Sequence, residues 1–543
     1  MRTQKPSLIK SGMGLSVLTL LSRVLGLVRE ATKSAFLGTG PLADAFTIAF
    51  MIPNLLRRIF AENTMTVAFI PTFREYCERC KRDGSQPAHK SRLNGAALYG
   101  DEMKEFLSAS FTMIAFTAAA AAALGMIGAA VIIALFFPKI ADYAATVFLT
   151  RFMFPYLLLI SIAAFFQGIL NGVRIFLPTG ITPIFFNLSV IGGTYLLAKP
   201  LHNPAYAMAV GVIAGGVLQM LMQLPFVLKA GFRFSVVSLY RTFTNAGTRK
   251  ILMLLVPTLI GTAAYQINDL VSTALASYVG VGVASSLQYS IRLQELILGV
   301  FVVSVSTVIL PDLSSYAVHK DWSSFQALLT AAANIIAFIT IAATLFLLCS
   351  GEKLIILVYK SNRFDDESVR LTLQAFRWHS AGLFFIALNR IITAAFYAQS
   401  NTKTPTVAGI ASFAVNILAA SIAAPFMKGG GIAFSLSFAS LVHTALLFYF
   451  LRAGTHIDTP LFLRDTLIFV GKVFVFSLIA VLPLYFFADY LYAPFAHYHR
   501  FIAIGVPFIA SAALYGLAVT VGMLVSGDTF LIQCLHKLKK RWH

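Results

Sequence analysis

Charged side chains interrupt an apolar segment near the N-terminus, and their types suit the binding of a phosphorylated ligand. The stretch LLSRVLGLVREATK holds Arg23, Arg29, Glu30 and Lys33. A charge inside a bilayer costs about 2.5 kcal/mol or more, so such residues are retained for a function or are paired. Arginine stays charged and presents a planar fork of donors, which matches the oxygens of phosphate or pyrophosphate.

The spacing of the arginines along helices places them at matching depths. Arg23 lies about 16 residues before the turn GTGP and Arg57 about 17 after it, so at 1.5 Å per residue both lie roughly 25 Å from that turn. Arg29 and Arg292 each lie about nine residues from the outer end of their segments, roughly 14 Å deep. We therefore predict a water-filled cationic cleft between two lobes that receives an anionic head group. The alternative is that these arginines snorkel to the interface or make structural ion pairs.

Acidic residues offer local partners to some of these cations. No such partner is expected for Arg29, Lys33 or Arg57, so the predicted cleft is net positive. The expected pairs are Arg23 with Glu30 on one helix face, Arg58 with Glu62 at i,i+4, and Arg292 with Glu295 at i,i+3.

The chain that positions these residues has the composition of an integral membrane protein. Of its 543 residues 58% are hydrophobic and 12% are charged, and the mean hydropathy is +0.80. Soluble domains carry roughly 25% charged residues. Apolar stretches of about 20 residues recur throughout, without the alternation typical of membrane β-barrels. We predict an all-α polytopic membrane protein with about 14 transmembrane helices. The predicted segments are 10–37, 42–72, 104–137, 144–171, 178–199, 205–229, 248–279, 283–317, 324–350, 371–399, 404–427, 431–453, 464–489 and 500–526.

Lysine and arginine in the connections orient the chain. With the N-terminus in the cytoplasm, the inner connections and the two ends hold 24 of these residues and the outer connections hold 8. The positive-inside rule therefore places both termini in the cytoplasm. The connection 351–370 carries four basic and four acidic residues on the outer side, and we interpret it as an ordered external loop. The net charge of +20 reflects this orientation, and no nucleic-acid partner is predicted.

Short matches within the chain indicate an internal repeat. TVAFIPTFREY is similar to STVILPDLSSY, and this match aligns Pro71 with Pro311 at an offset of 240 residues. Two further pairs of similar segments follow in the same order along the chain, at offsets of 227 and 223 residues. The offset corresponds to six helices, so the two copies share one orientation and the substrate site is expected between them. The predicted division is an N-lobe over 1–230, a C-lobe over 245–454, a C-terminal helix pair over 460–526 and a basic cytoplasmic tail over 527–543.

Motifs for catalysis are absent from the sequence. Cys77 and Cys80 form C-x-x-C, but no second ligand pair follows at zinc-site spacing, so we interpret them as thiols in a reduced loop. No H-E-x-x-H or nucleophile motif occurs, and no apolar segment holds paired aspartates, so no catalytic residue is predicted and a transporter is favoured over an intramembrane glycosyltransferase. Two further alternatives stay open, a multidrug or oligosaccharide-lipid exporter and a non-transporting scaffold. A drug exporter for cations should place acids in its cavity, whereas this cavity is expected to be cationic.

Five segments resemble the MurJ (MviN) family of lipid II flippases, part of the multidrug/oligosaccharidyl-lipid/polysaccharide exporter superfamily. They are SRVLGLVRE, ADAF, PNLLRRIFAE, AFIP and FYAQSNTKTP. The resemblance covers nearly the whole chain and implies fourteen helices, arranged as two six-helix lobes and a pair that forms a groove for a lipid tail. It also implies transport of lipid II, the undecaprenyl-pyrophosphate-disaccharide-peptide used in peptidoglycan synthesis, from the inner to the outer leaflet of the bacterial cytoplasmic membrane by alternating access.

The resemblance implies partners and substrate-binding residues as well. Lipid II, membrane lipids and cell-wall synthesis proteins are the expected partners. Asp44 and Glu62 match acidic positions of the family, and Glu30 stands where some relatives carry aspartate. The substrate-binding residues expected are Arg23, Arg29, Arg57, Arg292, Asp44, Glu62, Glu30 and Glu295.

Relatives also depend on membrane potential and hold a cation in the C-lobe, so sodium or chloride and the potential are expected to drive the cycle. Asp269 is the only acid in its apolar segment, and Ser412 and Asn416 are i,i+4 neighbours. Their oxygens suit a hard cation such as sodium. The alternative for Asp269 is a structural hydrogen bond between helices.

Overall fold

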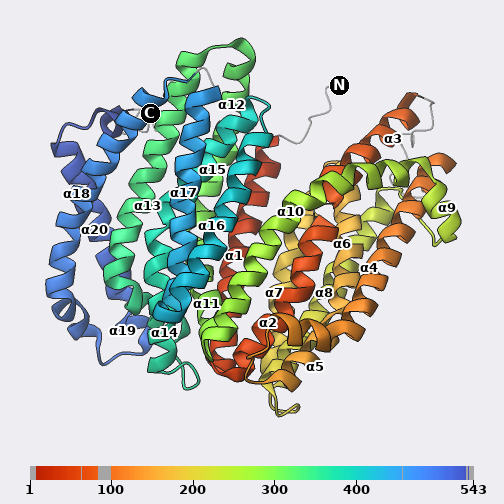
Figure 1. Cartoon of the computed structure of the whole chain (residues 1–543), viewed down its shortest axis with the longest axis horizontal. Helices are drawn as coiled ribbons and strands as arrows, with labels where there is room; N and C mark the ends of the chain where they lie inside the picture. The colour runs from red at the N-terminus through yellow and green to blue at the C-terminus, as the bar shows by residue number, and fades with distance from the viewer. Residues whose placement is uncertain (1–7, 63, 83–99, 455–456, 534–535, 537–543) are drawn as a thin grey trace. The chain divides into compact units, whose positions relative to one another are not determined.

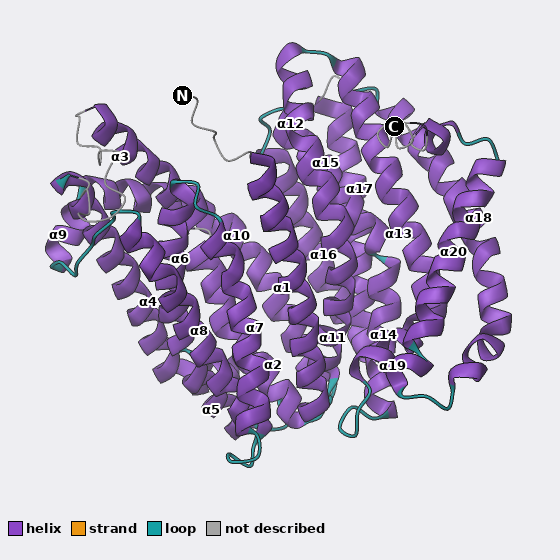
Figure 2. Cartoon of the chain, turned by 180° about the vertical axis from the view of Figure 1, so that it is seen from behind, coloured by secondary structure: helices purple, strands orange, loops and turns teal. Residues whose placement is uncertain are grey.

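The computed structural model describes residues 8–62, 64–82, 100–454, 457–533 and 536, and these are helical apart from short connections (Figures 1 and 2). No strand occurs among the described residues, which confirms the all-α prediction. Contacts divide the chain into two compact units, Met1–Ala284 and Ser285–His543. The finer division into lobes, helix pair and tail stays a prediction.

The first unit contains the helices that carry most of the candidate residues. In chain order they are α1 (Leu8–Leu37), α2 (Pro41–Arg57), η1 (Arg58–Glu62), η2 (Thr64–Phe69), α3 (Ile70–Arg82), α4 (Asp101–Phe136), α5 (Tyr143–Met153), α6 (Pro155–Gly172), α7 (Leu177–Leu197), α8 (Pro204–Lys229), α9 (Leu239–Thr244) and α10 (Ala246–Val279). Proline at the first position of α2, α6 and α8 fixes a helical φ where no N–H donor is needed.

The second unit begins within α11 (Val283–Ile297), and the helices that follow it complete this unit. They are η3 (Leu298–Val302), α12 (Val303–His319), α13 (Trp322–Tyr359), α14 (Asp366–Ala381), α15 (Leu383–Ala398), α16 (Lys403–Met427), α17 (Gly429–Gly454), α18 (Thr459–Tyr492), η4 (Ala493–Phe495), α19 (Arg500–Ala503) and α20 (Gly505–Val525).

In the part of the chain that the structure describes, each predicted apolar segment is helical over most of its length. Nine stretches of helix among the described residues, or ten if the bent pair α14 and α15 is one span, are long and apolar enough to cross a membrane. The pair is bent by 41°. The prediction of about 14 spans is consistent with this pattern, since the remaining predicted segments are covered by α1, by α2 with η1 and η2, by α10, and by α11 with α12.

Two connections differ from the predictions. Cys77 and Cys80 lie on helix α3 rather than in a loop, because α3 buries Phe73 and Cys80 on one face while Arg79 on the other stays exposed. The loop expected over 351–370 is a short turn, since α13 continues to Tyr359 and α14 begins at Asp366. Asp365 caps α14 by accepting from the backbone N of Ser368 at 2.9 Å, which starts that helix early.

Helices α7 and α8 approach each other through glycine. A Cβ atom on Gly211 would lie 2.8 Å from the Cα of Val190, and one on Gly193 would lie 3.0 Å from the Cα of Gly211. Small residues permit such backbone contact between membrane helices. The contact brings the polar side chains of both helices to one pocket of the first unit.

A π-helical segment interrupts each unit at an equivalent position. The first, η1, follows α2, and the second, η3, follows α11. Their starts at Arg58 and Leu298 are 240 residues apart, the same offset that aligns Pro71 with Pro311. An equivalent break in the helical hydrogen bonding at that offset supports the predicted internal repeat.

Candidate functional site

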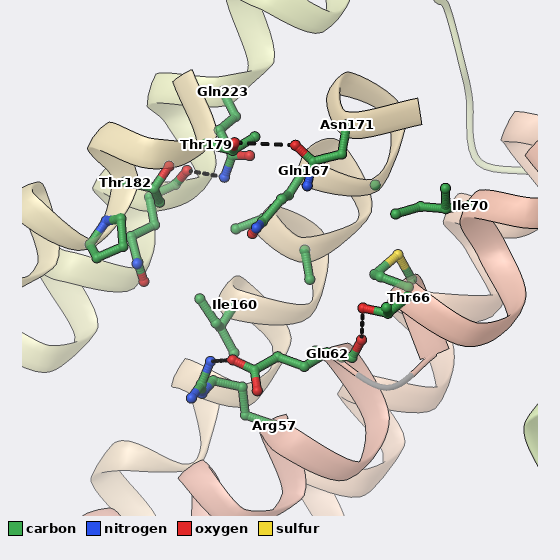
Figure 3. Close-up of a pocket in the computed structure, with 17 residues that line it drawn as sticks. Arg57, Glu62, Thr66, Ile70, Ile160, Gln167, Asn171, Thr179, Thr182 and Gln223 are labelled. Carbon is green, nitrogen blue, oxygen red and sulfur yellow. Dashed lines mark hydrogen bonds and ion pairs between the residues drawn. The ribbon is translucent and has the colours of Figure 1, made fainter. Parts of the chain in front are cut away.

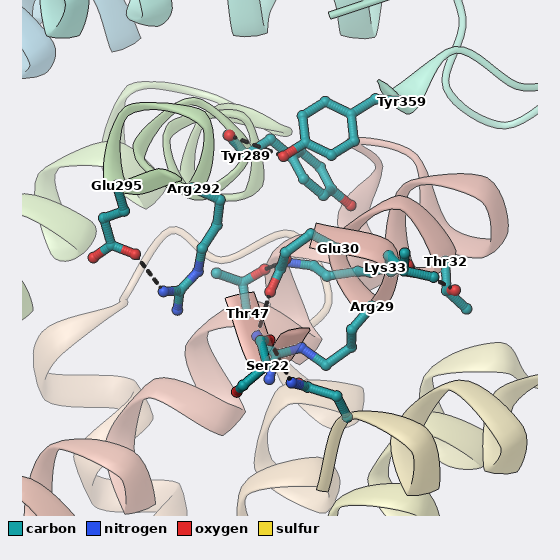
Figure 4. A network of polar contacts seen from close by, with 12 residues as sticks. Ser22, Arg29, Glu30, Thr32, Lys33, Thr47, Tyr289, Arg292, Glu295 and Tyr359 are labelled. Atoms are coloured by element: carbon teal, nitrogen blue, oxygen red, sulfur yellow. Dashed lines mark hydrogen bonds and ion pairs between the residues drawn. The ribbon is translucent and has the colours of Figure 1, made fainter. Parts of the chain in front are cut away.

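An ion cluster holds the buried end of the charged stretch on α1. Nη2 of Arg29 donates to Oε1 of Glu30 at 2.8 Å, and Nζ of Lys33 lies 4.0 Å from Oε2 of Glu30 (Figure 4). Lys33 also donates to Oγ1 of Thr47 on α2 at 2.7 Å. The prediction that Arg29 and Lys33 lack partners is therefore wrong. Glu30 is buried between them and serves both cations, so the expected pairing of Glu30 with Arg23 is also wrong.

The remaining contacts of α1 fix its position against α7. Nδ2 of Asn187 donates to the backbone oxygen of Ser22 at 3.2 Å. The guanidinium of Arg29 lies over the ring of Phe186 at 5.6 Å, which adds a cation–π attraction. Arg23 is half-buried, and no carboxylate of the described residues pairs with it. The arginines of α1 thus differ, since Arg29 is held on two sides and Arg23 is not.

Arg57 is held at the junction of α2 and η1. Its Nε donates to Oδ1 of Asn54 at 2.9 Å, and its Nη1 forms an ion pair with Glu62 (Figure 3). The prediction that Glu62 pairs with Arg58 is wrong, because η1 is wound as a π-helix. In a π-helix the backbone bonds run from i to i+5, which brings residue 62 over residue 57. The Glu62 side chain is 55% exposed and the Arg57 side chain 20%.

The second unit contains a similar pair on α11. Nη1 of Arg292 donates to Oε2 of Glu295 at 2.6 Å, which confirms the predicted i,i+3 pairing (Figure 4). The two side chains are 31% and 49% exposed. Arg57 and Arg292 therefore each combine a guanidinium with a more exposed carboxylate that an anionic ligand could replace.

The four candidate cations of α1 and α2 outnumber the acids that pair with them. The Arg57–Glu62 pair is partly exposed, and exposed ion pairs contribute only about 0.2–1 kcal/mol, so a pyrophosphate that makes several charge-assisted hydrogen bonds can compete with Glu62. The cations are Arg23, Arg29, Lys33 and Arg57, and the paired acids are Glu30 and Glu62. These side chains together carry a positive charge, and the cationic cleft itself stays a prediction.

Asp44 makes a structural contact at the other end of α2. It is buried in the first turn of the helix and accepts a hydrogen bond from the backbone N of Gly282 at 2.6 Å. That bond ties α2 to the turn after α10. Its expected role in substrate binding stays a prediction.

The residues of the tentative cation site lie in different units. Asp269 is on α10 of the first unit, and Ser412 and Asn416 are on α16 of the second. The Ser412 hydroxyl donates to the backbone oxygen of Ala439 at 2.8 Å, and Asn416 is buried. Within the described residues, no group of three or more His, Cys, Asp or Glu side chains could hold a metal ion. A cation at Asp269, Ser412 and Asn416 stays a prediction.

A polar pocket of about 430 Å³ was missed by the sequence analysis. It lies in the first unit, with Arg57, Glu62 and Thr66 on one side and the amides and hydroxyls of α6, α7 and α8 on the other (Figure 3). Each of these three apolar helices contributes two polar residues three or four positions apart, which share one face. That spacing was a usable signal. The pairs are Gln167 with Asn171, Thr179 with Thr182, and Gln219 with Gln223.

Comparison with known proteins places the chain among membrane flippases. The family model described as "Lipid II flippase MurJ" matches residues 33–502. A probable lipid II flippase MurJ of Treponema pallidum is 47% identical over 98% of this chain and 99% of its own length. A lipid II flippase MurJ of Burkholderia cenocepacia is 30% identical over 87% of this chain and 89% of its own.

Solved structures agree with the fold. A lipid II flippase MurJ in an inward closed conformation matches with a TM-score of 0.74 at 24% identity, covering 94% of this chain and 98% of that chain. An inward-facing multidrug resistance MATE family transporter of the MOP superfamily matches with a TM-score of 0.63 at 13% identity, covering 83% of this chain and 99% of that one. At these identities the structures support the architecture alone.

Proposed function

The chain belongs to the lipid II flippase MurJ family, and we propose that its partly exposed arginines bind the pyrophosphate of lipid II while the molecule crosses the membrane. The observation that supports this function most directly is the 47% identity to a probable lipid II flippase over nearly the whole chain. The transported molecule is lipid II, a precursor for peptidoglycan synthesis, and the protein that moves it is a multi-pass membrane protein.

The arginine pairs suit a ligand that must be bound and then released. Arg57 and Arg292 each have a partly exposed carboxylate as a resting partner, so neither guanidinium is left without a counter-charge before the substrate arrives. A pyrophosphate accepts several charge-assisted hydrogen bonds and replaces those carboxylates. When the substrate leaves, Glu62 and Glu295 return to the arginines, which limits the free energy lost on release.

Alternating exposure of these arginines to the two sides of the membrane then moves the head group from the inner to the outer leaflet. The polyprenyl tail stays in lipid throughout, beside α18 and α20. Since one elementary charge moved across the membrane is worth about 2.3 kcal/mol per 100 mV, the membrane potential can bias the cycle. Return of the empty carrier uses the potential together with a sodium or chloride ion.

The protein lies in the bacterial cytoplasmic membrane, with its N- and C-termini on the cytoplasmic side. The threefold excess of lysine and arginine in the connections on that side supports this orientation, since 24 of these residues lie there against 8 outside. In this orientation α3 and the start of α10 lie on the cytoplasmic side, where the substrate is made.

The test is genetic complementation in cells depleted of their own flippase. We expect Arg29→Ala and Arg292→Ala to abolish growth while the variants are still present in the membrane. Arg464→Ala is the matched control, because the Arg464 side chain is 70% exposed and pairs with its neighbour Asp465. Full growth of cells carrying Arg29→Ala or Arg292→Ala contradicts the assignment of the arginines.

A further inference from the structure

The amide-lined pocket beside Arg57 has a chemistry different from that of the arginines, and we propose that it binds the sugar next to the pyrophosphate of the lipid substrate. This assignment rests on the proposed function and deepens it. The pyrophosphate supplies negative charge to the guanidinium, while the sugar supplies hydroxyl and acetamido N–H donors to neutral acceptors. The pocket is therefore a second subsite for the same ligand.

The position of the pocket fits the order of groups in such a lipid. Figure 3 shows Arg57 and Glu62 at one end of the pocket and Asn171, Thr179 and Gln223 at the other. A pyrophosphate held by Arg57 has its neighbouring sugar at the mouth of the pocket. The far end lies where α6 ends and α7 begins, on the side predicted to face the cytoplasm.

Two buried acceptors of α8 point to a ligand that donates hydrogen bonds. Oε1 of Gln219 and Oε1 of Gln223 have no hydrogen-bond partner among the described residues. Gln219 is 7% exposed to solvent and Gln223 is 0% exposed. The Nε2 of Gln223 is already used, since it donates to the backbone oxygen of Gln219 at 3.0 Å. A buried acceptor without a donor destabilises a protein, so both oxygens are available to accept hydrogen bonds from O–H or N–H groups of a bound molecule.

The charge of the lining favours a neutral group. Arg57 and Glu62 are the charged residues that line this pocket, and they pair with each other at its edge. The rest of the polar lining consists of amides and hydroxyls. A stem peptide carries carboxylates and an amine, whereas a sugar ring with an acetamido group is neutral. A volume of about 430 Å³ lies near the lower end of ligand pockets, roughly 300–1,000 Å³, and suits one ring.

The π-helix η2 forms the wall of the pocket opposite the amides, and its contacts hold it against α6. Thr66 of η2 lines the pocket and donates to the backbone oxygen of Glu62 at 3.0 Å. Gly168 of α6 allows η2 to approach, because a Cβ there would lie 2.8 Å from Cδ1 of Phe69 and 3.1 Å from the sulfur of Met65. π-Helical turns are found frequently at functional sites, and Met65 and Thr66 of this one line the pocket.

Binding of two lipid probes to the purified full-length protein tests the proposal. One probe is undecaprenyl pyrophosphate, and the other is undecaprenyl pyrophosphate bearing a single N-acetylhexosamine. We expect the wild type to bind the sugar-bearing probe about tenfold more tightly, as two added hydrogen bonds predict. The double variant Gln219→Met/Gln223→Met keeps the side-chain volume but removes both acceptors. It should lose that preference and still bind undecaprenyl pyrophosphate as the wild type does.

Thr194→Val is the matched control, since Thr194 is a buried polar residue of α7 that donates to Val190 and does not line the pocket. Equal binding of both probes by the wild type overturns the sugar subsite and leaves the proposed function intact. A wild type that binds neither probe contradicts the proposed function itself. The wild-type comparison stands even if the double variant fails to fold.

Discussion

At the scale of single residues, three of the four candidate arginines, Arg29, Arg57 and Arg292, are held by a glutamate. Their positions in apolar segments were readable from the sequence, because charge in a bilayer is rare and costly. Their partners were not readable. Arg29 pairs with the adjacent Glu30, although neighbouring helix residues do not normally face each other. Long side chains bend to reach a partner, and that choice depends on packing that spacing rules omit.

Glu62→Gln tests whether the carboxylate competes with the substrate for Arg57. The variant removes the negative charge but keeps a polar side chain of the same size. Undecaprenyl pyrophosphate should bind up to about fivefold more tightly, since an exposed ion pair contributes about 0.2–1 kcal/mol. Isothermal titration with the purified protein measures this. Weaker binding of the variant argues that Glu62 holds Arg57 in place for the ligand instead of competing with it.

Asp44 gives a separate stability prediction. Its buried carboxylate accepts from the backbone N of Gly282, and Asp44→Ala removes that hydrogen bond. Hydrogen bonds to charged groups contribute about 1.5–3 kcal/mol, and we expect a clear drop in the melting temperature of the purified protein. Asp44→Asn keeps an acceptor and should lose less. Equal melting temperatures for wild type and Asp44→Ala would show that the bond contributes nothing to folding.

At the scale of helices, hydropathy and proline or glycine breaks were sufficient to locate the predicted segments. The π-helical turns were not predictable, since they arise from i,i+5 bonding that no sequence period marks. This local change moved the expected partner of Glu62 from Arg58 to Arg57. The pocket amides were visible as i,i+4 pairs, for example Gln219 with Gln223, but their convergence depends on which helices pack together.

The close contact of α7 with α8 can be tested with two glycines of the chain. In Gly211→Ala the new Cβ would lie 2.8 Å from Cα of Val190, so the backbones must move apart. Overpacking of this kind costs about 1–3 kcal/mol, and the melting temperature should fall. Gly192→Ala on α7 is the control, because nothing lies within 4 Å of a Cβ placed there. The contact is irrelevant to stability if the two variants melt alike.

Helix α3 is attached to the rest of the first unit by an ion network that responds to pH. Hydrogen bonds from Lys250 and Arg79 hold the pKa of the Glu75 carboxyl below its usual value. A lowered pKa stabilises the folded state above the pKa of the unfolded chain, about 4.3, and this contribution disappears as the pH falls through the lowered value.

We therefore expect the melting temperature of the wild type to fall more between pH 7 and pH 3 than that of Glu75→Gln, which has no such carboxyl to protonate. Because Glu75 is exposed to solvent, the difference should be small and should shrink at high salt. Identical pH dependence of the two proteins excludes a role for this network in stability.

At the scale of the whole molecule, each unit has its own helices, π-helical turn and arginine–glutamate pair. The repeat stays a prediction, which rests on similar segments that place Pro71 and Pro311 240 residues apart, and η1 and η3 begin at the same offset. Family membership was predictable, since PNLLRRIFAE and its companion segments occur in order. Asp44 was expected to bind substrate, yet its contact to Gly282 depends on a turn more than 200 residues away, which no local pattern indicates.

The most direct test of the account is transfer of labelled lipid II across vesicles that contain the purified protein. The wild type should move labelled lipid II to the opposite leaflet much faster than empty vesicles do. Arg29→Ala, reconstituted in equal amount, should move it no faster than empty vesicles. Transfer by Arg29→Ala at the wild-type rate would contradict pyrophosphate binding by the arginines.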